Sequence, residues 1–378
     1  SSSFDEPKCP ASQCQMIGKI SDYFVVGDQV GRGSFGVVYR AKPLPLGRSL
    51  IRSTIGKGRA IPREVVLKEI RLDLAGSADL DIFVREVTLL RSYTMGIPGV
   101  VQYYGCALAR EDEVTRYYVV MEYIDGVELF DFMTEVRNQD RIDNVAAQAF
   151  EIVHRVHEAG LVHRDIKLEN FMIDREDRLT LIDFGLSCLL KARAEQEADI
   201  GAAGGGGRRS GKRRYNLERL DPLRDMYCRS GLAGTAIYTS PVLIEKYRLK
   251  QPLTPGDLVY GDWWSLAVTI YQLYHKVTPF RGTMPKRYSN SFYNFHQALA
   301  NGELLFEINT SKIPEWVNRT LDIGVTLQGS QRRQAAQGSQ RRQAAQGSQR
   351  RQAAQGSQRR QAAQVGQGSQ RHQAAQKK

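Results

Sequence analysis

The string His163-Arg-Asp-Ile-Lys-Leu-Glu-Asn170 decides the fold of this chain, together with Asp183-Phe-Gly185 downstream. An amphipathic helical pattern, Asn144–Ala159, comes directly before the first string, and the apolar run Leu179–Ile182 comes directly before the second. Two carboxylates and an amide at these spacings are typical of a phosphoryl-transfer site. One carboxylate accepts a hydroxyl proton there, and the other binds magnesium together with the amide.

A glycine-rich string lies upstream, Gly31-Arg-Gly33-Ser-Phe-Gly36-Val-Val38. Residues 23–40 have the pattern of two strands around a glycine turn, which places the string in a hairpin instead of a strand-to-helix junction. Backbone amides in such a hairpin can cover a triphosphate. Alone the string is weak evidence, because dinucleotide-binding folds use a similar one and an ordinary tight turn is the other interpretation.

Lys68 follows thirty residues after Val38, inside the apolar strand predicted over Glu64–Leu72. A charged side chain in such a strand is costly unless it meets a negative partner, which the phosphates of a nucleotide would supply. Glu86 comes eighteen residues later, within the helical pattern Asp79–Ser92, where it is able to pair with Lys68. No Walker A string is present.

With five motifs in this order, the chain resembles the eukaryotic protein kinase family from about Phe24 to Leu327. The resemblance implies an α+β, bilobal fold, with a β-rich N-lobe over about 23–122 and a mainly helical C-lobe, truncated at its end, over about 126–327. It implies an enzyme that transfers the γ-phosphate of Mg-ATP to protein substrates. Lys167, two residues beyond Asp165, is the serine/threonine-kinase form of this loop.

The resemblance also assigns roles to the matching positions. Lys68, braced by Glu86, would hold the ATP phosphates. Asp165 would be the catalytic base, and Lys167 would steady the transferred phosphate. Asn170 and Asp183 would bind Mg²⁺. The other ATP-binding positions are the loop glycines, an adenine contact, the gatekeeper, the hinge and a ribose contact: Gly31, Gly33, Gly36, Val38, Met121, Glu122, Tyr123 and Glu128.

Two further strings resemble structural parts of the same family. Gly234-Thr235 is similar to the start of the substrate-binding loop, and Asp262-Trp-Trp264-Ser is similar to the helix beneath the catalytic loop. Glu128 and Glu169 match acidic positions that contact substrate arginines in basophilic relatives, while Gln272 stands at a third such position. The resemblance therefore implies a mild preference for substrates that are basic around the phosphorylation site.

The likeness breaks at the end of the activation segment, where Ser240-Pro241-Val242 replaces the family's Ala-Pro-Glu. The arginine that pairs with that Glu is not recognisable after Ile313–Leu327, so both charges are absent together and neither is left unpaired. An insert at about 191–230 lengthens the segment and contains the candidate phosphosites Ser210 and Ser230. Arg164 before Asp165 is the arrangement that lets a loop phosphate order the site.

These departures favour a second hypothesis, a catalytically weak or inactive kinase fold that serves as a scaffold. Such pseudokinases usually lack an equivalent of Lys68, Asp165 or Asp183, and this chain keeps all three.

The net charge of +12 belongs to a C-terminal tail, 328–378, built on the repeat Gln-Gly-Ser-Gln-Arg-Arg-Gln-Ala-Ala. The tail has nine Arg, two Lys and no acid, so it carries +11 and leaves +1 for residues 1–327. We expect the tail to be disordered, because it has no large apolar side chain to bury. The body implies no specific nucleic-acid partner, and a weak tether of the tail to RNA, DNA or anionic lipid is the other interpretation.

The remaining sequence bounds the class of protein. Hydrophobic residues form 42% and charged residues 25%, which excludes a fibrous or wholly disordered chain. The longest mostly apolar stretch, Trp263–Tyr274, is short of the ~20 residues that a membrane span needs. Residues 1–22 form an N-terminal extension and Pro43–Pro62 a polar insert. A cytoplasmic location is favoured, although tandem repeats beside a divergent kinase also resemble secreted rhoptry kinases of apicomplexan parasites, with a signal peptide removed upstream.

Two residue types receive plain interpretations. The five cysteines (Cys9, Cys14, Cys106, Cys188 and Cys228) are too few and scattered for a disulfide scaffold, which fits a reducing compartment. Cys188 is interpreted as an ordinary small residue, with a redox-sensitive thiol as the alternative. His154 and His157 are predicted on the polar side of a helix and not as metal ligands.

Overall fold

The computed structural model describes residues 14–33, 36–71, 77–111, 114–190, 228, 231–281 and 291–322. The chain divides into two units, Ser1–Gly324 and Val325–Lys378, and every described residue belongs to the first. The expectations for the repeat tail, for the insert at 191–227 and for Ser210 and Ser230 lie outside the described residues.

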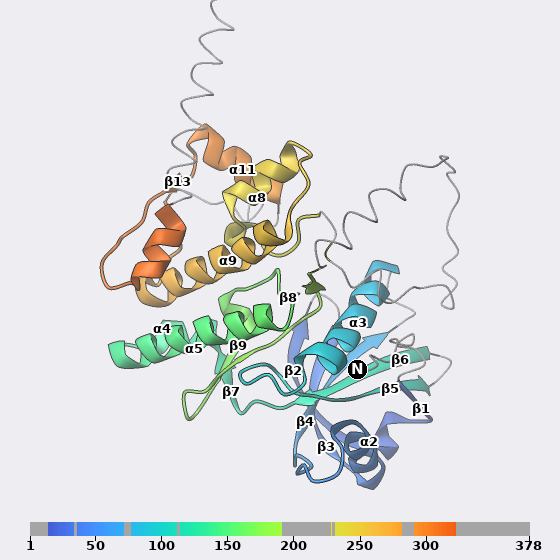
Figure 1. Ribbon diagram of the computed structural model, residues 1–378. Helices are drawn as coiled ribbons and strands as arrows, with labels where there is room; N and C mark the ends of the chain where they lie inside the picture. Colours follow the sequence, from blue (N-terminus) through green and yellow to red (C-terminus); the bar gives the residue numbers. More distant parts are fainter. Residues whose placement is uncertain are drawn as a thin grey trace, which may run out of the picture. The chain divides into compact units, whose positions relative to one another are not determined.

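A six-stranded sheet forms the N-lobe, in the order β1-β5-β6-β4-β3-β2 (Figure 1). The strands are β1 (Gln15–Ile17), β2 (Phe24–Gly33), β3 (Gly36–Pro43), β4 (Val65–Arg71), β5 (Tyr103–Glu111) and β6 (Val114–Glu122). β1 runs parallel to β5, and the other neighbours are antiparallel. The glycine string therefore lies in the β2–β3 hairpin, as predicted, and part of the N-terminal extension adds a strand to the sheet.

Helices cover both faces of this sheet, because successive strand residues point to opposite sides. Val119 lies in the same buried cluster as Phe83 of α3 (Ser77–Leu89), and α3 continues into a short π-helical turn, Leu90–Thr94. Val120, the next residue of β6, lies in the cluster of Leu50 and Ile51 of α2 (Pro45–Ile55). The polar insert predicted over Pro43–Pro62 therefore contains an amphipathic helix that belongs to the N-lobe core.

The C-lobe is mainly helical, with α4 (Leu129–Glu135), α5 (Gln139–Glu158), α8 (Pro241–Arg248), α9 (Pro255–His275) and α11 (Phe292–Asn301). Residues 315–322 are also helical. Its short strands are β7 (Gly126–Glu128), β8 (Leu161–Val162), β9 (Phe171–Asp174), β10 (Leu179–Leu181), β11 (Cys188–Leu189), β12 (Phe280–Arg281) and β13 (Leu305–Phe306). The α5 helix begins earlier than the predicted Asn144, because the Asn138 side chain caps it by accepting from the Arg141 amide.

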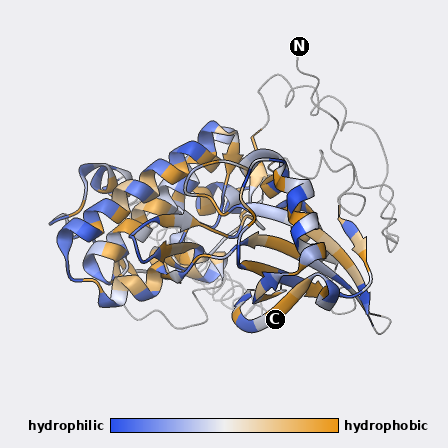
Figure 2. Ribbon diagram, turned by 90° about the horizontal axis from the view of Figure 1, so that it is seen from below, coloured by the Kyte–Doolittle hydropathy of each residue, from blue (hydrophilic) through white to orange (hydrophobic). Residues whose placement is uncertain are grey.

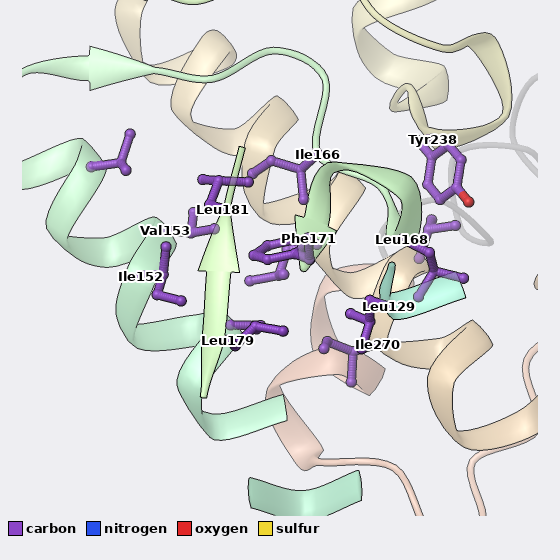
Figure 3. Close-up of a cluster of buried hydrophobic side chains, with 14 of the residues drawn as sticks. Leu129, Ile152, Val153, Ile166, Leu168, Phe171, Leu179, Leu181, Tyr238 and Ile270 are labelled. Carbon is purple, nitrogen blue, oxygen red and sulfur yellow. The ribbon is translucent and has the colours of Figure 1, made fainter. Parts of the chain in front are cut away.

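The C-lobe core is where the catalytic segments are anchored. Figure 3 shows Ile152 and Val153 of α5 close to Leu181 of β10 and to Phe171, and all four side chains are buried. Ile270 of α9 belongs to the same buried cluster, and α9 is apolar on most sides and largely buried. The helices in Figure 2 carry both hydrophilic and hydrophobic colouring, whereas the sheet strands are mostly hydrophobic.

Two disulfides join four of the cysteines, Cys14–Cys106 and Cys188–Cys228, with Cα–Cα separations of 4.6 and 4.9 Å. The interpretation of Cys188 as an ordinary small residue is therefore wrong, because Cys188 is bonded to Cys228. The partners are 92 and 40 positions apart, so only the fold brings them to bonding distance. The cysteine count consequently gives no support to a reducing compartment.

Candidate active site

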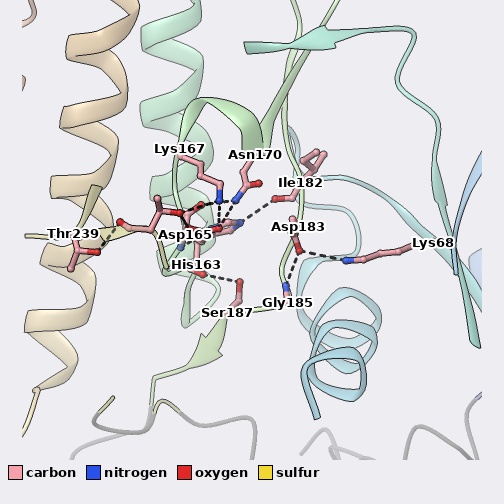
Figure 4. Close-up of polar contacts among 11 residues, drawn as sticks. Lys68, His163, Asp165, Lys167, Asn170, Ile182, Asp183, Gly185, Ser187 and Thr239 are labelled. Atoms are coloured by element: carbon pink, nitrogen blue, oxygen red, sulfur yellow. Dashed lines mark hydrogen bonds and ion pairs between the residues drawn. The ribbon is translucent and has the colours of Figure 1, made fainter. Parts of the chain in front are cut away.

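Lys68 and Glu86 form a buried ion pair at the inner face of the sheet. The Lys68 Nζ donates to both Glu86 carboxylate oxygens at 2.6 and 2.7 Å, and the two side chains are only 7% and 1% exposed. A third carboxylate oxygen, Oδ1 of Asp183, lies 3.5 Å from the same Nζ (Figure 4). Burial would lower the pKa of Lys68, but the two carboxylates raise it, so the ammonium remains charged.

Asp183 follows β10 in the left-handed backbone region, with φ of 62°. Its Oδ1 accepts from the Gly185 amide at 3.3 Å. Burial would raise its pKa, but Lys68 and the Gly185 amide hold the pKa below its ordinary value. Phe184 is fully buried against the His163 ring, which fixes the Asp183-Phe-Gly185 turn from below. The structure thus presents an ionised carboxylate beside the Lys68–Glu86 pair.

The catalytic loop gathers its polar groups around the Asp165 carboxylate. The Lys167 Nζ lies 2.8 Å from Oδ2, and the Asn170 Nδ2 donates to the backbone oxygen at 2.7 Å and to Oδ2 at 3.1 Å. The Thr235 hydroxyl donates to Oδ1 at 2.9 Å and accepts from Lys167 at 3.1 Å. Thr235, placed by sequence only at the start of a loop, is therefore a member of the site.

Asp262 of α9 holds this loop from beneath, as its resemblance implied. Its buried carboxylate accepts from the backbone amides of His163 and Arg164 at 2.7 and 2.8 Å. The His157 Nε2 lies 2.9 Å from the same carboxylate, and its side chain is only 9% exposed. The prediction that His157 lies on the polar side of α5 is wrong. The side chain is buried, and its Nε2 has a hydrogen-bond partner in Asp262.

The predicted nucleotide-binding positions lie along the hairpin and the β6–β7 connection. Gly31 pairs with Val38 across the hairpin, and Gly33 with Gly36. A Cβ at Gly36 would overlap the Glu69 carbonyl oxygen, so glycine is required there for packing. Val38 also pairs with Lys68, which places β3 of the hairpin beside the strand of the lysine. Residues 34 and 35 lie outside the described part of the loop.

The side chains at the gatekeeper and hinge positions face other groups of the protein. Met121 is 8% exposed, as a gatekeeper in the core would be. The Glu122 carboxylate accepts from the Gln102 amide at 3.2 Å, and burial raises the pKa of Glu122. The Arg40 guanidinium lies 4.5 Å from the centre of the Tyr123 ring. The side chains of Glu122 and Tyr123 are thus engaged with the protein, which leaves a hinge role to their backbone.

Glu128 begins α4 close to two other carboxylates. Burial raises the pKa of Glu128, and Asp131 and Glu169 raise it further. The third position, Gln272, is buried and uncharged. The acidic character next to the catalytic loop therefore comes from Glu128, Asp131 and Glu169. Asp131 was not among the predicted residues, and its one-turn spacing from Glu128 is the signal that could have found it.

The oxygen donors of Asn170 and Asp183 suit Mg²⁺, which prefers carboxylate and amide oxygens. The Nδ2 of Asn170 is turned to Asp165, so this amide is held in one orientation beside the catalytic loop. The ionised state of Asp183 at neutral pH fits the same ion.

The chain matches a family model described as a protein kinase domain over residues 24–337. The serine/threonine-protein kinase PEPKR2 of Arabidopsis thaliana is 29% identical over 276 residues, which are 72% of this chain and 44% of that protein. Calcium-dependent protein kinase 29 of the same plant is 26% identical over 300 residues, 78% of this chain and 43% of the relative. The chain spans less than half the length of these relatives.

Among the described residues, no helix is long and apolar enough to cross a membrane.

Proposed function

Since the chain belongs to the protein kinase family, we propose that it transfers the γ-phosphate of Mg-ATP to serine and threonine hydroxyls of proteins. The α+β, bilobal fold expected from the sequence is the fold of that family and is confirmed. The resemblance to secreted apicomplexan kinases stays a prediction.

One observation carries the proposal: the charged groups of the two lobes are assembled in one place. The Lys68 ammonium contacts Glu86 from α3 and Asp183 from the C-lobe, so three segments far apart in sequence meet at one cation. Pre-arranged charges of this kind stabilise the charge that develops on a transferred phosphoryl group, without reorganisation during the reaction.

The chemical step then follows from the catalytic loop. The Asp165 carboxylate would accept the proton of the substrate hydroxyl, which attacks the γ-phosphorus while the bond from that phosphorus to the β–γ bridging oxygen breaks. Lys167, 2.8 Å from Asp165, neutralises charge on the transferred group, and Thr235 orients both side chains. Bound Mg²⁺, held by Asn170 and Asp183, would neutralise charge on the phosphates. The presence of Lys167 two residues beyond Asp165 supports the serine/threonine preference.

Basic substrates are favoured by the charges beside the loop. Glu128, Asp131 and Glu169 place three carboxylates within mutual electrostatic reach. Since Gln272 is neutral and buried, the third family position adds no charge there. The preference for arginine or lysine in the substrate is accordingly mild.

The scaffold alternative loses part of its support at α8. The Glu of the missing Ala-Pro-Glu string would stand at Val242, but α8 carries Glu245 one turn later. The Glu245 carboxylate lies 2.9 Å from the His296 Nε2 of α11 and also binds Arg248. Lys246 in turn donates to Asp257 of α9 at 2.6 Å. These contacts fasten the end of the activation segment to the C-lobe without the family's usual pair.

The test is phosphate transfer from radiolabelled Mg-ATP to a generic basic protein, followed by identification of the phosphorylated amino acid. We expect labelled serine or threonine, loss of transfer in Asp183→Ala, and normal transfer in Glu176→Ala, which removes an exposed carboxylate. An increase in melting temperature with ATP, without phosphate transfer, would favour the scaffold. The absence of both phosphate transfer and ATP binding would refute both functions.

A further inference from the structure

The Cys188–Cys228 disulfide fastens the activation segment directly beside the catalytic loop. Cys188 lies on β11, which pairs with β8 immediately before the loop, and it is 1% exposed. The Cys228 amide donates to the Leu189 oxygen at 3.0 Å, so a backbone bond accompanies the disulfide. The disulfide thus joins two described residues that flank the long insert and stand 40 positions apart in the sequence.

The residues just after Cys228 contact the catalytic machinery. The Gly231 oxygen accepts from the Arg164 Nη2 at 2.7 Å. Gly234 has φ of 99° and lies so close to the Arg164 oxygen that a Cβ would overlap it. Thr235 binds both Asp165 and Lys167. Only seven positions separate the disulfide from Thr235, so its constraint acts on the residues that orient the catalytic base.

Arg164 is the residue that the resemblance reserves for a loop phosphate, yet here its guanidinium contacts the fastened segment itself. Its Nη2 binds Gly231, and its Nη1 lies 3.7 Å from the Cys188 Sγ. Burial, together with nearby Arg85, lowers the pKa of Arg164 to about 10, so the side chain remains a cation at neutral pH. The segment is therefore attached at Arg164 without any phosphate.

We propose that Cys188–Cys228 is a redox modification site that switches the kinase, with the oxidised disulfide holding the activation segment in its working position. A dithiol reductant would transfer two electrons and two protons to the disulfide, yielding two cysteine thiols while the dithiol becomes a disulfide. Reduction would then remove the covalent link between β11 and Cys228, and Gly231–Thr235 would be held by its contacts with Arg164, Asp165 and Lys167 alone. The inference rests on the proposed function.

The second disulfide, Cys14–Cys106, provides a matched control. It joins the strand region of the N-terminal extension to β5, and in the described part of the chain no hydrogen bond or ion pair links either cysteine to the catalytic loop. Reductant opens both disulfides, whereas Cys228→Ser removes only the first and Cys14→Ser only the second. Cys228→Ser is preferred to a change at Cys188, because it leaves the buried side chain in place.

The experiment compares the full chain purified without reductant and after treatment with dithiothreitol. Peptide mapping under non-reducing conditions must first show the Cys188–Cys228 linkage. We expect reduction to lower the transfer rate on the order of tenfold to a hundredfold, because displacing a positioned group by about 1 Å can cost that much. Cys228→Ser should be slow before and after reduction, and Cys14→Ser should respond as the natural chain does. Equal rates for oxidised and reduced protein, or a fast Cys228→Ser variant, would overturn the proposal.

Hydrogen exchange separates this proposal from the proposed function. The amides of Tyr238 and Thr239 donate to Thr235 and Ala236, so peptides over 231–240 report whether the segment is held. We expect faster exchange there after reduction and in Cys228→Ser, and no change in Cys14→Ser. If no transfer is seen in any state, the proposed function fails, and exchange alone decides the disulfide's role. Hydrogen exchange over 231–240 that is unchanged on reduction would refute the redox proposal.

Discussion

At the scale of single residues, the main feature of the site is a buried lysine whose charge is balanced by neighbouring carboxylates. Lys68 would be costly in the apolar interior of the N-lobe if Glu86 did not accept two hydrogen bonds from it. Asp183 completes the arrangement from the other lobe at 3.5 Å. A buried pair of this kind adds little net stability over an apolar pair, but removing one member leaves an uncompensated charge.

We therefore expect Glu86→Gln to lower the free energy of unfolding by about 2–3 kcal/mol, since the Lys68 ammonium would keep a hydrogen-bond acceptor but lose the nearer of its two opposite charges. The KM for ATP should rise as well, because Lys68 would no longer be held in place. Urea denaturation and steady-state kinetics measure the two effects. Glu315→Gln, which alters an exposed pair with Arg319, is the control. An unchanged denaturation midpoint in Glu86→Gln would contradict the expectation.

At the scale of elements, the N-lobe sheet has a helix on each face, and α2 is the one that the amino-acid pattern concealed. Ile51 is fully buried and Leu50 is 3% exposed, whereas Leu46 is 50% exposed. Gly47 is needed where α2 approaches the chain before β2, because a Cβ there would overlap the Tyr23 oxygen. The insert between β3 and β4 is thus part of the folded lobe.

Ile51→Ala should accordingly destabilise the protein by about 3 kcal/mol, the usual cost of emptying a buried site of this size. Leu46→Ala, in the same helix, should leave the unfolding free energy nearly unchanged because the side chain is already in water. Chemical denaturation of both variants gives the comparison. Equal effects of the two substitutions would show that α2 is not anchored through Ile51.

The ion pair of Asp257 at the start of α9 predicts that the stability of the fold depends on pH. Burial would raise the pKa of Asp257, but Lys246 and Thr254 together hold it below its ordinary value. A lowered folded-state pKa stabilises the fold above the unfolded pKa of about 3.9, and this stability is lost as the pH falls through the folded-state value. Asp257→Asn should cost about 1–2 kcal/mol at pH 7 and progressively less below pH 4. Denaturation of both proteins at pH 7 and pH 3 checks this, and a cost that stays constant over that range would argue against the pair.

At the scale of the whole molecule, charge and catalysis are separated along the sequence. The kinase-domain match ends at residue 337, and most of the positive charge follows it. Residues 338–378 contain seven Arg and two Lys, so removing them lowers the net charge from +12 to +3, because 12 − 9 = 3.

Deletion of residues 338–378 should abolish binding to single-stranded RNA at low salt and leave phosphate transfer to a small basic peptide within about twofold. The binding that is lost should be steeply salt-dependent, because it depends on counterion release from the phosphates. Fluorescence anisotropy at 50 and 200 mM salt, beside the transfer assay, measures both. RNA affinity that survives the deletion would place the binding surface in residues 1–337.

The sequence by itself determined the family and the bilobal fold, and it proposed the candidate residues of the site. It could do so because a phosphoryl-transfer centre needs particular residue types at short, local spacings, as in His163–Asn170, and because period-2 and period-3.6 patterns predict β4 and α5. The tertiary structure alone decided the pairs that are distant in sequence: Thr235 with Asp165, His157 with Asp262, and the two disulfides. No local pattern encodes such pairs. They form where packing of the core brings segments together, and for that reason the redox site was visible only in the fold.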